Sequence, residues 1–234
     1  MGKKGTIVLI HGFLGSFRTW EKMRFYLLWK GYNVKSPTLP SELKTTNPDA
    51  EKAADYVYRY LSFRKVENPL ILVGHSFGGL IAKQFYLKFR DEYDIPAIIT
   101  LSTPHRGVRW GRKIMSFIME NIDLPPGKTI PWINKETLMN LNRTFSYDSP
   151  VIGKLNKAFY GDIKFLLIGA TIDSPRHLTP VGDGVVELDS QIPPFVKRLP
   201  NVRYRIFHGV NHMNIQKIPQ TRDLIYRFIG EIMD

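Results

Sequence analysis

The stretch LILVGHSFGGLIAKQF, residues 70–85, changes character at Ser76. The run of Leu, Ile and Val before it is typical of a buried strand, and the residues after it have the spacing of a helix. Ser76 lies between Gly74 and Gly78, so the turn has little room for neighbouring side chains. Such a turn pushes the hydroxyl out above the sheet, with the helix N-terminus behind it. We therefore interpret Ser76 as a nucleophile rather than as a serine that only caps a helix.

The rest of the chain alternates between apolar runs and amphipathic segments. The expected strands are Thr6–Ile10, Tyr32–Lys35, Leu70–Val73, Ala97–Leu101, Lys164–Ile168 and Val202–Phe207. Short apolar strands that alternate with helices predict an α/β fold, with a doubly wound, mostly parallel sheet of about six strands covered on both faces.

Four helices are expected between or after these strands. One covers Trp20–Trp29, and one follows Ser76. Another starts at Asn47-Pro48-Asp49, where Asn47 can cap the helix and Pro48 fits its first turn. The last follows Pro219, and its apolar side consists of Leu224, Ile225, Phe228, Ile229 and Ile232.

The connection between the fourth and fifth expected strands is longer than one crossover helix requires. We assign residues 1–107 and 161–234 to the core and residues 108–160 to a helical insertion. The apolar side of its first expected helix consists of Trp110, Ile114, Met115, Ile118, Met119 and Ile122. Such a helix could simply pack on the core. We favour a cap or lid, because the insertion follows the carboxyl edge of the sheet, where α/β folds bind ligands.

Composition limits the classes of protein to which the chain can belong. Its 234 residues are 43% hydrophobic and contain no Cys, which excludes disulfides and thiolate metal sites. The net charge is +12, but Lys and Arg are spread along the chain, so we expect no nucleic-acid partner. The N-terminal MGKKGTIVLIHG contains an apolar run too short to span a membrane and no cleavage signal. We expect a cytoplasmic protein, and secretion of a processed form stays open.

Several motifs resemble one known superfamily. The elbow GHSFGG resembles the nucleophile elbow of the α/β-hydrolases, and LIHGFLGS, residues 9–16, resembles their oxyanion loop. LSTPHRG (101–107), GDGVVELDS (182–190) and HGVNHMNI (208–215) are similar to segments of bacterial lipases and carboxylesterases. The resemblance covers nearly the whole chain and implies a serine hydrolase that needs no cofactor and no catalytic metal.

A serine hydroxyl needs a base, and the base needs a carboxylate that holds it in the correct tautomer. In this superfamily the order along the chain is Ser, Asp or Glu, then His. His212 lies between the last strand and the last helix, and the resemblance also makes it the base. We expect His208 to be structural. The histidines expected to form loop hydrogen bonds are His11, His75 and His105.

Three aspartates follow the fifth expected strand. GDGVV matches the lipase pattern at Asp183, which we prefer as the acid. Asp173 is the alternative, because it lies closer to the strand end; it could also be a turn residue in Asp-Ser-Pro. We expect Asp189 to cap a helix or to form local hydrogen bonds.

The oxyanion donors should be the backbone amides of Phe13 and Phe77. The candidate substrate-binding residues are Leu14, Phe17, Trp110, Ile114, Ile118 and Met119. These apolar side chains favour a small-molecule or lipid carboxylic ester with a short to medium acyl chain, and transient contact with a lipid interface stays open. The alternatives are a thioesterase, an acyltransferase, a peptidase or a non-catalytic binding protein. A haloalkane dehalogenase is disfavoured, because its chemistry needs a carboxylate in place of Ser76.

Overall fold

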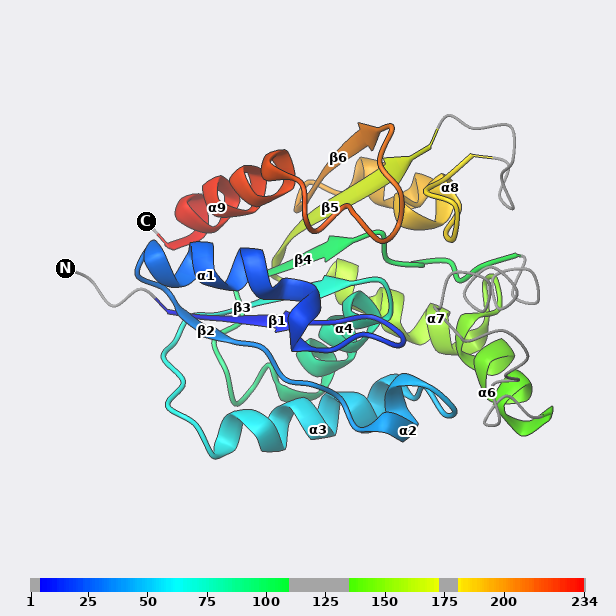
Figure 1. Ribbon diagram of the computed structural model, residues 1–234, viewed down its shortest axis with the longest axis horizontal. Helices are drawn as coiled ribbons and strands as arrows, with labels where there is room; N and C mark the ends of the chain where they lie inside the picture. The colour runs from blue at the N-terminus through cyan, green and yellow to red at the C-terminus, as the bar shows by residue number, and fades with distance from the viewer. Residues whose placement is uncertain (1–4, 110–134, 173–180, 234) are drawn as a thin grey trace, which may run out of the picture.

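A single sheet runs through the protein (Figure 1). The computed structural model describes residues 5–109, 135–172 and 181–233. The strands are β1 (Thr6–Ile10), β2 (Asn33–Lys35), β3 (Leu70–His75), β4 (Ala97–Leu101), β5 (Lys164–Thr171) and β6 (Val202–His208). They lie in the order β2-β1-β3-β4-β5-β6, and every neighbouring pair is parallel. The six predicted strands and the parallel sheet are confirmed.

Helices cover both faces of this sheet. The described helices are η1 (Phe17–Trp20), α1 (Glu21–Trp29), α2 (Ser41–Lys44), α3 (Ala50–Ser62), α4 (Phe77–Phe89), α6 (Lys135–Phe145), α7 (Pro150–Leu155), η2 (Asn156–Tyr160), α8 (Leu188–Gln191), η3 (Pro194–Arg198) and α9 (Pro219–Met233). Figure 1 shows α1 and α9 on one face of the sheet and α3 and α4 on the other. This is the doubly wound arrangement that the sequence predicts. Among the described residues, no helix is long and apolar enough to cross a bilayer.

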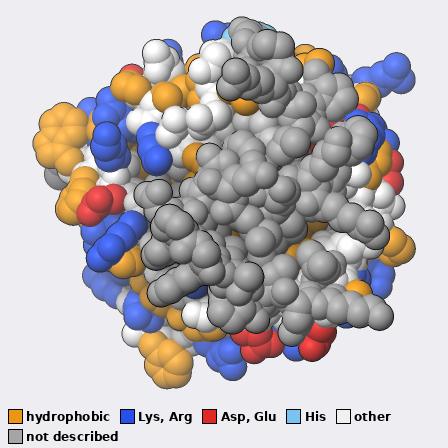
Figure 2. Space-filling model, turned by 45° about the vertical axis from the view of Figure 1, so that its right-hand side comes forward, with side chains coloured by type: hydrophobic (Ala, Val, Ile, Leu, Met, Phe, Trp, Pro, Cys, Tyr) orange, Lys and Arg blue, Asp and Glu red, His pale blue; other side chains and the backbone are white. Residues whose placement is uncertain are grey.

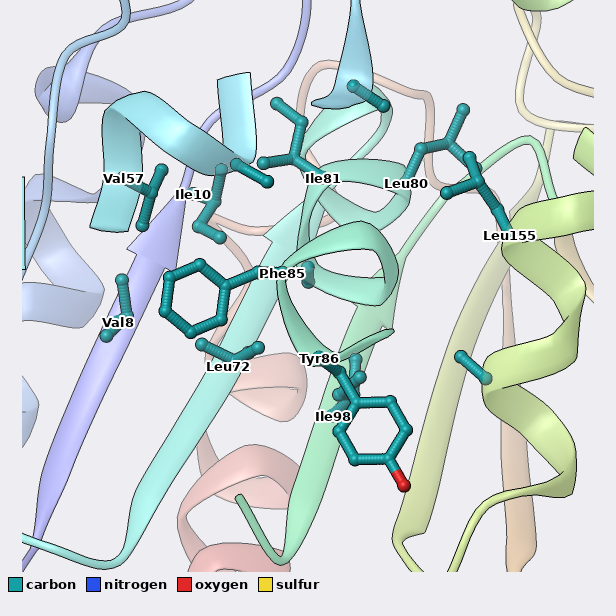
Figure 3. Packing of buried hydrophobic residues seen from close by; sticks show 14 of the residues in the cluster. Val8, Ile10, Val57, Leu72, Leu80, Ile81, Phe85, Tyr86, Ile98 and Leu155 are labelled. Atoms are coloured by element: carbon teal, nitrogen blue, oxygen red, sulfur yellow. The ribbon is translucent and has the colours of Figure 1, made fainter. Parts of the chain in front are cut away.

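Each face of the sheet has its own core, because successive strand residues point to opposite sides. Ile7 and Leu9 of β1 contribute to the cluster under α1 and α9. Val8 contributes to the cluster under α3 and α4. Figure 3 shows the ring of Phe85 on α4 close to Val8 and Leu72. All five side chains are fully buried, so β1 and β3 are covered on both faces, as central parallel strands usually are.

Helix α3 begins two residues later than the sequence suggests. Asp49 is its N-cap, and the carboxylate accepts hydrogen bonds from the second and third helical amides at 2.9 and 3.1 Å. The predicted cap at Asn47 is therefore wrong, and Pro48 lies outside the helix, which starts at Ala50. The physical reason is that one carboxylate already satisfies two of the amides that a helix N-terminus leaves without partners.

The second half of the insertion packs on the core. Ile152 and Leu155 of α7 and Phe159 of η2 belong to the same buried cluster as α4. The predicted helix that contains Trp110 and Ile118 lies outside the described residues. A cap over the carboxyl edge of the sheet therefore stays a prediction.

A lysine lies in the core between α4 and the end of the insertion. Lys83 is fully buried, its Nζ donates to Oδ1 of Asn156 at 2.6 Å, and it lies 4.9 Å from the centre of the Phe159 ring. Asn156 in turn donates to the carbonyl of His105 at 2.8 Å. Among the described residues, Lys83 forms no ion pair with an acid. Burial therefore lowers the pKa of Lys83 well below its usual value.

The buried Lys83 predicts a distinctive dependence of stability on pH. Between its lowered folded pKa and its unfolded pKa of about 10.4, the unfolded chain binds one more proton than the folded chain. Stability should therefore rise with pH in that window, by up to about 1.4 kcal/mol per pH unit, and Lys83→Met should remove this rise. Urea unfolding between about pH 8 and pH 10 measures the difference.

Lys88→Met is the matched control for this experiment. Lys88 lies on the same helix but is paired at the surface with Asp55, a hydrogen bond that raises its pKa. The control should keep the wild-type slope in this window. Parallel stability curves for the wild type and Lys83→Met would show that Lys83 is charged in the folded protein.

Candidate active site

Ser76 occupies a strained turn between β3 and α4. Its φ of 55° and ψ of −123° are unfavourable for a residue with a side chain, and its amide donates to the carbonyl of Leu101 at 2.8 Å. Ser76 is the N-cap residue of α4, but its hydroxyl forms no capping hydrogen bond. The turn therefore exists without help from the hydroxyl, which stays available for chemistry.

The two glycines of the elbow allow three backbone segments to meet. A Cβ atom on Gly74 would lie 2.4 Å from the backbone of Gly78, and one on Gly78 would lie 2.1 Å from the carbonyl oxygen of Ile10. Neither position can hold a side chain without a backbone shift. The lack of space that the sequence predicts at these glycines is confirmed.

The loop after β1 reaches the same point. A Cβ on Gly12 would lie 2.9 Å from the Cβ of Ser76, so the backbone next to Phe13 passes directly beside the serine. Phe77 is the first residue of α4, and its amide has no acceptor within the helix. The structure thus brings the segments of both predicted oxyanion donors, Phe13 and Phe77, to the serine.

His11 holds the loop after β1 in place. Its Nε2 accepts from the amide of Leu39 at 3.0 Å, so its Nδ1 carries the proton and donates to the carbonyl of Gly12 at 2.8 Å. Burial is the main reason that the pKa of His11 is lowered to about 4. This neutral imidazole forms loop hydrogen bonds, as predicted.

The predicted base and acid lie side by side. Nδ1 of His212 donates to Oδ2 of Asp183 at 2.8 Å, and the His212 amide donates to the Asp183 carbonyl at 3.0 Å. Both side chains are almost completely buried. The proton on Nδ1 leaves Nε2 of His212 as the acceptor, which is the tautomer that a general base needs.

A second histidine joins the base to the elbow. Nε2 of His75, the residue before Ser76, donates to the carbonyl of His212 at 2.9 Å, and the two rings lie 4.8 Å apart. The pKa of His75 is lowered to about 3; burial is the main cause, and the electrostatic effect of the neighbouring His212 is the second. His75 therefore stays neutral and couples the position of His212 to the nucleophile turn.

The Asp183 carboxylate is held in its ionised form. Burial by itself would raise its pKa, but the charge and hydrogen bond of His212, the Val186 amide and the Ser102 hydroxyl outweigh burial and lower it. Oδ1 accepts from the amides of Val185 and Val186 at 3.0 and 2.8 Å. Ser102 follows β4 with a φ of 47° and is fully buried, and the sequence analysis did not single it out.

The other two aspartates have different positions. Asp173 lies outside the described residues. Asp189 forms a bidentate ion pair with Arg109, at 2.7 and 3.2 Å, and accepts from the hydroxyl of Tyr147 at 2.6 Å. The expectation that Asp189 bonds locally or caps a helix is therefore wrong, because its partners lie about 40 and 80 positions away in the chain. These partners are the guanidinium of Arg109 and the phenol of Tyr147, which reach Asp189 at the start of α8.

The remaining described histidines take no part in the contact between acid and base. Nε2 of His105 shares a 3.0 Å hydrogen bond with the hydroxyl of Thr100. Nδ1 of His208 shares one of 2.9 Å with the hydroxyl of Thr171, where β5 and β6 end. Both arrangements agree with the structural roles that the sequence suggests. Among the described residues, no group of three or more His, Asp or Glu side chains could hold a metal ion.

Aromatic side chains surround the oxyanion segments. The ring of Phe145, at the end of α6, packs edge-on against the rings of Phe13 and Phe77 at 6.2 and 5.3 Å. Leu14 is partly buried in the same loop, and Phe17 is 45% exposed. The other predicted substrate-binding residues, Trp110, Ile114, Ile118 and Met119, lie outside the described residues. Phe145 was not predicted, because only its position at the end of an amphipathic helix marks it in the sequence.

Comparison with known proteins agrees with this geometry. The alpha/beta hydrolase family profile matches residues 7–216. Comparison with curated proteins finds no match. Solved structures of similar fold include a carboxylesterase of the thaumarchaeon Nitrososphaera gargenis, with 16% identity over 98% of this chain and 91% of that chain and a TM-score of 0.67.

Two further solved structures have the same fold. The esterase RhEst1 from Rhodococcus sp. is 16% identical over 97% of this chain and 91% of that chain, with a TM-score of 0.65. The Bacillus licheniformis lipase BlEst2 is 19% identical over 98% and 93%, with a TM-score of 0.55. The family profile covers most of the sequence, and the parallel sheet, the elbow and the order of the motifs agree with it. The chain therefore belongs to the alpha/beta hydrolase family.

Proposed function

We propose that the protein is a serine hydrolase that cleaves carboxylic esters through an acyl-enzyme intermediate. Ser76 is the nucleophile, His212 the general base and Asp183 the acid of the triad. The observation that carries this proposal is the buried 2.8 Å hydrogen bond from His212 to Asp183, which is linked through His75 to the strained serine turn. If the contact between His212 and Asp183 only stabilised the fold, there would be no reason for a serine in an unfavourable backbone conformation to lie beside it.

The reaction would follow the chemistry of a Ser-His-Asp triad. Nε2 of His212 takes the proton of the Ser76 hydroxyl while the oxygen attacks the ester carbonyl. Asp183 keeps the Nδ1 proton in place and stabilises the imidazolium that forms. The amides of Phe13 and Phe77 donate to the oxyanion. The imidazolium then protonates the leaving alcohol, and water, activated by the same histidine, releases the acid from the acyl-enzyme.

The proposed substrates are esters of short to medium acyl chains. The partly buried rings of Phe13 and Phe145 pack edge-on against each other and place apolar surface next to the proposed oxyanion donors, where an acyl group would lie. The solved structures of similar fold include proteins described as esterases and a lipase, which supports the same class of substrate. Assays with esters of increasing chain length would define the preferred acyl group.

The acid loop is held by one side chain that the sequence analysis did not identify. β4 ends at Leu101, so the edge of β5 beyond Ile168 has no neighbouring strand on that side. The buried side chain of Gln191 binds the backbone of β5 where a neighbouring strand would otherwise pair with it. Its Oε1 accepts from the Ala170 amide at 2.7 Å, and its Nε2 donates to the Ala170 carbonyl at 3.1 Å. Nε2 also donates to the carbonyl of Val186 at 2.8 Å. The amide of Val186 in turn binds the proposed acid, so Gln191 connects β5 to the acid loop.

Among the predictions for the proposed reaction, the first concerns the nucleophile and the base. Ser76→Ala and His212→Ala should each lower kcat on a short-chain ester by about 10³-fold or more, because the attacking oxygen or its base is lost. Ser76→Ala should also abolish labelling by a fluorophosphonate. His208→Ala is the control, since His208 bonds only to Thr171 among the described residues, and it should keep near-normal activity. Substantial turnover by purified Ser76→Ala protein would refute the proposed mechanism.

The second prediction decides between the two candidate acids. Asp183→Asn should lower kcat by about 10³- to 10⁴-fold, because the amide favours the wrong tautomer of His212. Asp173→Asn should change kcat by less than about threefold, in keeping with a turn residue. Steady-state kinetics of both variants on the same ester measure this. The reverse order of effects would move the acid to Asp173.

The third prediction tests Gln191 as a positioning residue. Gln191→Glu keeps an acceptor for the Ala170 amide but places a carboxylate against two carbonyls. It should lower stability by about 1–3 kcal/mol and kcat by about tenfold or more, with little change in KM. In an Asp183→Asn background the effect on kcat should vanish while the loss of stability remains. An equal loss of kcat in both backgrounds would reduce Gln191 to a purely structural role.

A further inference from the structure

The helix that follows the oxyanion loop is apolar on both sides. Met23 and Leu27 of α1 are buried against the sheet. Phe25, Leu28 and Trp29 lie on the opposite side, where they are 59%, 38% and 76% exposed. Their spacing of three and four residues places them in one stripe along the helix. A surface helix normally presents polar residues to water, so this stripe indicates a partner that the described part of the chain does not supply.

Cations accompany the exposed rings. The guanidinium of Arg24 lies 5.8 Å from the centre of the Phe25 ring, and Nζ of Lys30 lies 4.4 Å from that of Trp29. Residues 17–30 contain four basic residues (Arg18, Lys22, Arg24 and Lys30) and one acid (Glu21), a formal charge of +3 from four minus one. Within the described part of the chain, Lys22 and Arg24 form no ion pair with an acid.

This surface starts at the edge of the sheet that carries the candidate active site. Phe17, 45% exposed with Arg18 5.9 Å from its ring, lies four residues after Phe13. Figure 1 shows that α1 then runs from the carboxyl edge of the strands towards their opposite end. In the view of Figure 2, hydrophobic and basic side chains lie next to each other around the margin, with acidic ones among them. The exposed stripe therefore begins close in the chain to the proposed oxyanion segment at Phe13.

We propose that the outer side of η1 and α1 binds the surface of an anionic lipid bilayer. The aromatic and leucine side chains would enter the boundary between headgroups and acyl chains, and Arg18, Lys22 and Arg24 would meet the lipid phosphates. Arginine and lysine side chains can contact the acyl-chain boundary and the phosphates together, because their apolar stems cover apolar surface while the charged ends stay at the interface.

A second copy of the chain fits this surface less well. Two such surfaces in contact would bring a charge of +3 against +3, which disfavours self-association. A flat bilayer also needs no groove, whereas the exposed rings of Phe25 and Trp29 project from a convex helix.

Vesicle flotation of the full-length chain tests the proposal without reference to catalysis. Binding to vesicles of phosphatidylcholine and phosphatidylglycerol should be at least about tenfold stronger than to phosphatidylcholine alone, and salt should weaken it. Phe25→Ser combined with Trp29→Ser should lower the partition coefficient by about tenfold or more. Lys22→Glu combined with Arg24→Glu should abolish the preference for anionic vesicles.

Phe63→Ser is the matched control, because Phe63 is 85% exposed but lies at the end of α3. It should leave vesicle binding unchanged, and every variant should hydrolyse a soluble short-chain ester at the wild-type rate. Absence of binding, equal binding to neutral vesicles, or unchanged binding of the Phe25 and Trp29 double variant would overturn the proposal. A dimer in light scattering that this double variant dissociates would assign the surface to a second copy instead.

Discussion

The close approach of α4 to β1 is the contact on which the candidate site depends. Gly78 lies so near the carbonyl oxygen of Ile10 that even a methyl group would not fit between them. This approach forces the backbone of Ser76 into a conformation that a residue with a side chain normally avoids. The cost is sustained because fully buried side chains pack around the elbow from both cores of the sheet. The same contact brings the loop after β1 beside the serine, so one steric constraint assembles the proposed nucleophile and the proposed oxyanion donors.

A carboxylate partner distinguishes one of the three buried imidazoles near the serine from the other two. His11 and His75 are buried and strongly disfavour protonation, so they serve as fixed hydrogen-bonding groups. His212 is also buried, but it lies against the ionised carboxylate of Asp183, which can stabilise a positive charge on the ring. Of these three histidines, only His212 has a carboxylate partner. The division between the supporting imidazoles and the proposed general base therefore follows from one hydrogen bond to a carboxylate rather than from exposure.

Much of the fold could be predicted from the local pattern. Short runs of Val, Ile and Leu marked all six strands, since a strand buried on both faces must be apolar throughout. The sequence predicts the start of α3 at Asn47, because Asn can cap a helix and Pro48 fits a first turn; the carboxylate of Asp49 caps the helix instead and satisfies two amides at once. For the site, the strand-turn-helix pattern indicates Ser76, and the resemblance to lipase motifs, together with the order along the chain, indicates Asp183 and His212. The structure places Asp183 and His212 in direct contact and links His212 to the Ser76 turn.

The sequence by itself determined the alternation of strands and helices, the elbow glycines and the candidate triad, because each depends on residue type and spacing along the chain. Only the tertiary structure decided how Gln191 completes the edge of β5, how His75 binds the carbonyl of His212, and how Phe145 covers the oxyanion segments. The His75 contact spans 137 positions, and the contacts of Phe145 with Phe13 and Phe77 also join distant segments. Gln191 is nearer in sequence, yet its role exists only because β4 ends before β5 does. Such pairings arise from the order and lengths of the strands in the sheet, and no local pattern of residues encodes them.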